Sequence, residues 1–162
     1  MGMDVYGKKP TSEKGEYFRN NVWWWHPLWD FCCYLKPDLI NQVPNAHDNS
    51  GDGLSAVLSR HLGFKLQESI ITGQAQKYVD SYYESINSSP DEPCFCVNKS
   101  LIEVYSSTAE IPFPASKDPN PNCNICKGSG LQSNFLKNYH ISVENIQNFA
   151  NFLLDCGGFQ IC

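Results

Sequence analysis

Two closely spaced cysteine pairs are the part of this sequence best suited to chemistry. One residue separates Cys94 from Cys96, and two residues separate Cys123 from Cys126. Four thiolates in a tetrahedral arrangement bind one Zn²⁺, and such a closed site stabilises a fold without leaving a position open for catalysis. We therefore expect these four cysteines to hold a structural zinc ion.

The residues around the cysteines favour this interpretation. Cys126 is followed by Gly128 and Gly130 in a C-x-x-C-x-G-x-G pattern, and such glycines let the backbone turn tightly and direct amides at the sulfurs. Residues 88–131 are rich in proline and have little apolar core of their own, so a bound metal would explain how they fold. Two alternatives stay open: four reduced cysteines in a loose insertion, or a redox pair of Cys123 and Cys126.

A second candidate site is the aromatic block at residues 15–29, which contains all four tryptophans. Three of them are consecutive, so no helix or strand can bury all three on one face. Indoles stack on planar rings and arginine pairs with phosphate, which favours a ligand pocket. The alternative is a core anchor in which the indoles pack on helices and Arg19 pairs with Glu16. The expected pocket residues are Arg19, Asn20, Trp23, Trp24, Trp25, His26, Asp48, Asn49, Asp52 and Arg60.

The loop at residues 48–53 begins like a calcium-binding loop, with the pattern D-x-S-x-D-G. Its twelfth position is Ser59, where a calcium loop requires a bidentate glutamate, so calcium is disfavoured. The ordinary interpretation is a turn in which Asp52 or a neighbour caps the following helix. The loop could also bind an anion, because its amides would face the positive end of that helix, with Arg60 two turns in.

These residues must be positioned by a few helices. Apolar spacing predicts one helix that has Pro27 in its first turn, two more over 54–72 and 74–87, and a last one from Ser142 to the glycines at 157–158. The clearest apolar ladder belongs to the second helix and comprises Leu54, Leu58, Leu62, Leu66 and Ile70, with Val57 beside it.

The expected strands are short. Residues 22–25 are aromatic and β-branched and predict a strand, which could pair with the alternating residues 159–162. Residues 1–21 resemble an extended polar lead-in, and residues 100–105 could form a strand or a short helical turn. We therefore predict a single α+β domain over residues 1–162, with three to four helices and a small antiparallel sheet. Residues 88–131 would be a zinc-stapled, proline-rich insertion within it.

Composition excludes several classes of function. The formal net charge is −5 and no cluster of lysines or arginines occurs, which disfavours general nucleic-acid binding. No apolar run is long enough to cross a membrane, and the N-terminus lacks the apolar centre of a signal peptide, so we expect a cytoplasmic protein. The four histidines are scattered and no catalytic motif occurs, which argues against an enzyme.

Several motifs resemble a family of small proteins of bacteriophages and prophages. They are the start MGMDVYG, the block at residues 15–29, the loop at residues 48–54 and the ending SVEN…GGFQIC. Members of that family carry two C-x-x-C-x-G-x-G arms and often an arginine at the position of His26, whereas the first arm here is C-x-C without glycines. The resemblance implies a protein in the cytoplasm of a host cell that binds a host factor or sequesters a host signalling nucleotide.

We therefore expect a non-enzymatic binding protein that sequesters a small nucleotide-like ligand through its aromatic and arginine pocket. The first alternative is a protein–protein interaction module that inhibits a host factor, because tryptophan, tyrosine and arginine dominate interface energetics. The second is an unrecognised enzyme that acts on a nucleotide. The sequence is compatible with a homo-oligomer in each case.

Overall fold

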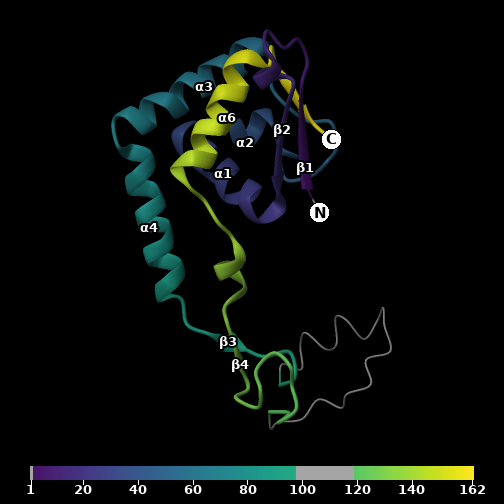
Figure 1. The fold of residues 1–162 in the computed structure, drawn as a ribbon, viewed down its shortest axis with the longest axis vertical. Helices are drawn as coiled ribbons and strands as arrows, with labels where there is room; N and C mark the ends of the chain where they lie inside the picture. The colour runs from purple at the N-terminus through teal and green to yellow at the C-terminus, as the bar shows by residue number, and fades with distance from the viewer. Residues whose placement is uncertain (1, 98–118) are drawn as a thin grey trace. The chain divides into compact units, whose positions relative to one another are not determined.

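The computed structural model describes residues 2–97 and 119–162 (Figure 1). The predicted element at residues 100–105 lies outside the described residues. Contacts divide the chain into two compact units, which we call the main unit (Met1–Ser85 with Asn138–Cys162) and the cysteine unit (Ile86–Lys137). Among the helices that the structure describes, none is long and apolar enough to cross a membrane.

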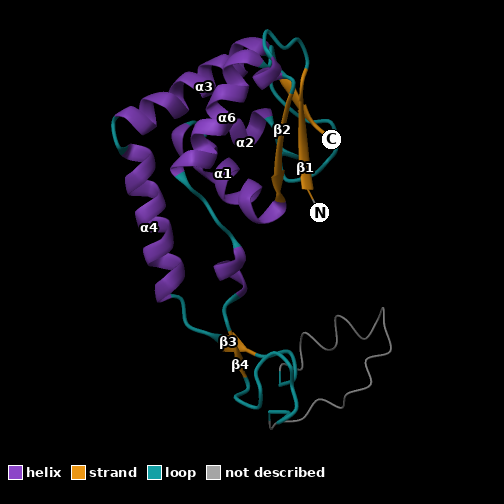
Figure 2. Cartoon of the chain, in the orientation of Figure 1, coloured by secondary structure: helices purple, strands orange, loops and turns teal. Residues whose placement is uncertain are grey.

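The main unit confirms the predicted α+β class, with helices packed on a three-stranded antiparallel sheet (Figure 2). The strands are β1 (Gly2–Gly7), β2 (Tyr17–Asn21) and β5 (Phe159–Ile161). The helices are η1 (Glu13–Gly15), α1 (Val22–Leu35), α2 (Leu39–Gln42), α3 (Ala56–Ile71), α4 (Gln74–Ser88), whose last residues enter the cysteine unit, and α6 (Val143–Asp155).

Strand β1 lies in the centre of the sheet, between β2 and β5. Val5 faces Phe18 of β2 on one side and Ile161 of β5 on the other. Two predictions are therefore wrong. Residues 1–21 are not a polar lead-in, because Met3 and Val5 are buried and alternate with polar residues along β1. The C-terminal strand pairs with β1 and not with residues 22–25.

Residues 22–25 form the first turn of α1 instead of the predicted strand. The Asn21 side chain accepts a hydrogen bond from the Trp24 amide at 3.2 Å and caps the helix one turn earlier than expected. Pro27 consequently lies inside α1, where it cannot donate to the Trp23 carbonyl. The His140 amide donates to that carbonyl at 2.8 Å. The carbonyl that Pro27 leaves free therefore binds the segment before α6.

The core forms around α6, which packs beside α3 on one side and the sheet on the other (Figure 1). Phe149 contacts Phe18 of β2 and Trp25 of α1, with ring centroids 4.9 and 5.5 Å apart. Gly63 of α3 permits the close approach of α6, because a Cβ there would lie 3.1 Å from the Leu154 side chain. The predicted apolar face of α6 is thus the centre of the main unit.

Helix α3 confirms most of the expected ladder. Ser55 caps it, and Leu54, Leu62 and Leu66 are buried. Val57 differs from the expectation and is 64% exposed, because it lies on the face of α3 opposite the ladder. Gly73 ends the helix with a φ of 75°, a conformation that favours glycine.

Helix α4 is tied to the segment that leads into α6. The Tyr83 hydroxyl donates to the Ile141 carbonyl at 3.0 Å, and the Ile141 amide donates to the Tyr83 hydroxyl oxygen at 3.2 Å. The two residues are 58 positions apart in the sequence. The main unit therefore holds both ends of the segment that contains the cysteine unit.

Replacing Trp25 by alanine should lower the free energy of unfolding by about 3–5 kcal/mol, because the indole is fully buried and donates to the Ala46 carbonyl. The adjacent Trp24 is only half-buried, so Trp24→Ala should cost clearly less. Urea denaturation followed by far-UV circular dichroism would measure both variants. Equal losses would contradict the assignment of Trp25 to the core.

Candidate metal centre

A short ladder brings the two cysteine arms together in the cysteine unit. Strand β3 (Glu92–Pro93) pairs with β4 (Leu131–Gln132), and the Cys94 amide donates to the Gly130 carbonyl at 2.9 Å. The first arm therefore begins where the second arm ends. Figure 2 shows this two-stranded ladder at the base of the loops that carry the cysteines.

The four sulfur atoms lie at distances that suit one metal ion. All four lie within 4.8 Å of one another, and the Sγ atoms of Cys94 and Cys123 are 3.7 Å apart. Those of Cys96 and Cys126 are 3.5 Å apart. A tetrahedral ion with bonds of about 2.3 Å to sulfur places its ligands about 3.8 Å apart, whereas a disulfide requires about 2.05 Å. The cluster could therefore hold a metal ion such as zinc.

The second arm uses left-handed backbone conformations to surround the sulfurs. Lys127, Gly128 and Gly130 have φ angles of 50°, 89° and 77°. The Lys127 amide donates to the Cys123 carbonyl at 2.8 Å, and the Ser129 amide donates to the Cys126 carbonyl at 3.0 Å. Gly128 and Gly130 adopt these conformations without steric cost, whereas Lys127 is a non-glycine residue in the left-handed region.

The electrostatics of the cluster differ from one thiol to the next. Desolvation raises the pKa of Cys126, but hydrogen bonds outweigh it and lower the pKa to about 6. Those bonds come from the backbone of Gly130, the Cys96 side chain, and then the backbone of Gly128. Desolvation raises the pKa of the buried Cys94 to about 12. The glycine arm therefore favours thiolate, the form that binds metals, as its sequence pattern predicts.

The structure divides the tryptophans of the second candidate site between core and surface. Trp25 and Trp29 are stacked at 5.7 Å and are 0% and 2% exposed. The Trp25 Nε1 donates to the Ala46 carbonyl at 2.7 Å. Trp25 thus occupies the position that the core-anchor alternative describes, because its ring packs against Phe149 of α6.

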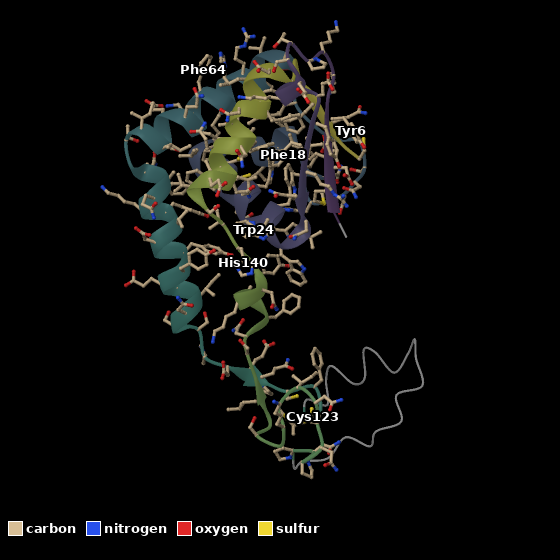
Figure 3. All side chains as sticks on the ribbon, in the orientation of Figure 1. Tyr6, Phe18, Trp24, Phe64, Cys123 and His140 are labelled. Carbon is tan, nitrogen blue, oxygen red and sulfur yellow. The ribbon has the colours of Figure 1, made fainter. Side chains whose placement is uncertain are left out.

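Trp23, Trp24 and His26 are half-buried and meet two residues that lie just before α6. The ring of Trp23 lies 5.0 Å from that of Tyr139, and the ring of Trp24 lies 5.4 Å from that of His140 (Figure 3). We call these five residues the aromatic surface. Tyr139 and His140 were not among the predicted site residues, although they immediately precede the segment that caps α6.

His26 also belongs to a titratable cluster. Its ring lies 5.7 Å from Tyr139 and 4.3 Å from His47, and His47 Nε2 lies 3.9 Å from an Asp30 carboxylate oxygen. Desolvation and the charge of His47 lower the pKa of His26. His26 is therefore mostly neutral near pH 7, so it offers a planar ring and not a positive charge to a ligand.

Arg19 and Asn20 lie on β2, and they contact the neighbouring strand β1 and helix α6 respectively. The Arg19 guanidinium lies 3.5 Å from the Asp4 carboxylate, its partner in the β1–β2 register. The alternative pairing of Arg19 with Glu16 is wrong, since cross-strand register selects Asp4. The Asn20 Nδ2 donates to the Asn145 Oδ1 at 3.1 Å.

The loop at residues 48–53 holds the sheet together. The Asp52 carboxylate accepts from the amides of Asn45 and Gly53, both at 2.9 Å, and the Gly51 amide donates to the Ile161 carbonyl at 2.7 Å. Asn49 donates to the Gly2 carbonyl at 3.0 Å. These contacts match the expected turn, although Ser55 and not Asp52 caps α3.

Two expected pocket residues lie on exposed surfaces. Asp48 is exposed in the loop. Arg60 lies on α3 beside a hollow of about 250 Å³ that Thr11 and Gly157 also line. The structure thus brings Trp23, Trp24 and His26 together and gives Asp52 and Asn49 structural contacts.

No protein-family model matches the chain, and comparison with curated proteins and with solved structures finds no match either. The resemblance to phage proteins therefore stays a prediction. The geometry of the cysteine cluster and of the aromatic surface is the basis on which a function can be proposed.

Replacing Gly130 by alanine should weaken metal binding about 10–100-fold, because a Cβ there meets the Pro119 side chain at 2.8 Å and the φ of 77° favours glycine. Competition with a chromophoric zinc chelator would measure the change. Gly51→Ala is the matched control, since Gly51 has a φ of 84° but lies in the main unit in open space. Equal affinities of the two variants would refute the role of the glycine arm.

Proposed function

We propose that Cys94, Cys96, Cys123 and Cys126 hold a structural Zn²⁺ that folds the cysteine unit of a non-enzymatic binding protein. The observation that carries this proposal is the closed cluster of four sulfurs within 4.8 Å. Four thiolates fill the tetrahedral coordination of zinc and leave no position for a reacting water. A site of this kind supports structure and not turnover.

The packing of the cysteine unit also supports a structural metal. In the part of this unit that the structure describes, Ile86 is the only buried hydrophobic side chain besides Cys94 and Cys126. So small an apolar core cannot offset the conformational entropy of folding. Binding of a metal ion to four thiolates supplies free energy of folding directly, and soft sulfur ligands in a tetrahedron select zinc or iron.

The Cys123→Ser variant should lose the metal, whereas Cys162→Ser should retain one ion per chain, because Cys162 is exposed and lies outside the cysteine unit. Native mass spectrometry against the denatured mass would count and identify the ion. Hydrogen exchange should then rise in the Cys123→Ser variant in the described parts of the cysteine unit, residues 86–97 and 119–137. A wild-type protein from zinc-replete cells that carries no metal would overturn the proposal.

We further propose that the aromatic surface binds a planar, nucleotide-like ligand. The half-buried ring of Trp24 beside His140 is suited to stacking against a base. The Asn145 Nδ2 is buried with no hydrogen-bond acceptor among the described residues, and a ligand could supply one. In the phage setting that the family resemblance implies, the ligand would be a host signalling nucleotide.

Trp24→Ala should abolish the rise in melting temperature that a bound nucleotide produces, because it removes the stacking face. A panel of purine and pyrimidine nucleotides in thermal-shift assays, with native mass spectrometry of freshly purified protein, would test this. Tyr34→Ala is the control, since Tyr34 is a 57% exposed aromatic residue outside the aromatic surface. No shift with any nucleotide and no co-purified small molecule would refute ligand binding and favour a protein partner.

A further inference from the structure

The outward face of α3 carries an apolar stripe. Val57, Phe64 and Ile71 are 64%, 55% and 85% exposed and recur at intervals of seven residues. Side chains with this spacing lie along one line of a helix, with a drift of about 20° per interval. The opposite face of α3 is already occupied, because Leu62 and Leu66 are buried and Gly63 packs on α6. The three apolar side chains alternate along this face with the polar residues Arg60, His61 and Glu68, so the face is a mixed apolar and charged surface that could pack against a partner.

The charges beside the stripe are arranged asymmetrically about Phe64. Arg60 and His61 lie on its N-terminal side, and Glu68 lies one turn to its C-terminal side. Glu68 contacts Lys65 of its own helix at 2.6 Å, whereas Arg60 makes no ion pair with any residue that the structure describes. The stripe therefore favours a partner that offers a negative charge near Arg60, whereas Glu68 already has a positive partner in Lys65.

A second copy of α3 in antiparallel orientation meets this requirement. With the twofold axis at Phe64, Val57 of one copy lies opposite Ile71 of the other, and each Arg60 lies level with the partner copy's Glu68. Parallel pairing would instead place like charges at the same level and repel the two copies. The surface is thus complementary to itself, as a twofold interface requires.

The surroundings of Phe64 also leave room for such a partner. A hollow of about 730 Å³ lies beside it, lined by residues that include Leu35, Pro37 and Glu68. The Phe64 ring of a second copy could enter this hollow and bury both rings. Helix α3 has 16 residues and is about 24 Å long, which is short for an interface of standard size.

We propose that this protein forms a reversible homodimer through antiparallel pairing of α3 with α3 of a second copy. The proposal is independent of the metal centre and of the aromatic surface. Because the paired surface is small, the dimer dissociates at micromolar protein concentrations.

Sedimentation velocity over a concentration series from about 1 to 200 µM tests this directly, because dimers with micromolar dissociation constants form and dissociate within that range. Wild-type protein is expected to shift from monomer to dimer, and Phe64→Glu is expected to stay monomeric throughout. The control is Leu136→Glu, which places the same charge at a residue that is 52% exposed and lies outside α3. Far-UV circular dichroism checks that each variant is folded. A wild-type protein that is monomeric at every concentration overturns the proposal.

A charge exchange tests the antiparallel orientation. Arg60→Glu and Glu68→Arg should each weaken dimerisation about fivefold, because each removes two symmetric ion pairs. The double variant Arg60→Glu with Glu68→Arg should regain the wild-type dissociation constant. If the double variant is weaker than both single variants, the antiparallel pairing is wrong.

Discussion

The central position of β1 is the constraint on which the main unit depends. Because β1 pairs with β2 on one edge and with β5 on the other, the sheet forms only when the two ends of the described fold meet. The buried side chains Met3 and Val5 then join the same core as the apolar residues of α6. The helices between β2 and β5 must return the chain to this edge, so α1, α3 and α6 pack around one core.

A single proline links this core to the aromatic surface. Pro27 leaves the Trp23 carbonyl without its partner inside α1, and the His140 amide occupies that carbonyl. This hydrogen bond places Tyr139 and His140 against the exposed side of Trp23 and Trp24. The hydrogen bond that Pro27 cannot make in α1 thus allows aromatic rings of α1 and of the segment before α6 to lie together.

The sequence predicted what depends on local patterns. Periodicity located α3, α4 and α6, the Ser142 cap is present, and the cysteine spacing identified four residues whose sulfurs cluster. It failed where long-range contacts decide. Residues 22–25 favour a strand by composition, but they form a helix, because Trp25 packs against the distant Phe149 and because Asn21 supplies a local cap that the strand prediction overlooked. The role of β1 could not be foreseen, since its partners lie at opposite ends of the chain.

The bond between Tyr83 and Ile141 gives the two units a thermodynamic link through the chain that connects them. That bond closes a loop of 58 residues, and the entropy lost on closure grows with the length of the free chain. A metal ion that joins Cys94 to Cys126 would shorten the free path to about 26 residues, which lowers this cost by about 0.7 kcal/mol. Metal binding to the cysteine cluster would therefore raise the free energy of unfolding of the main unit, because it lowers the entropic cost of closing the connecting loop.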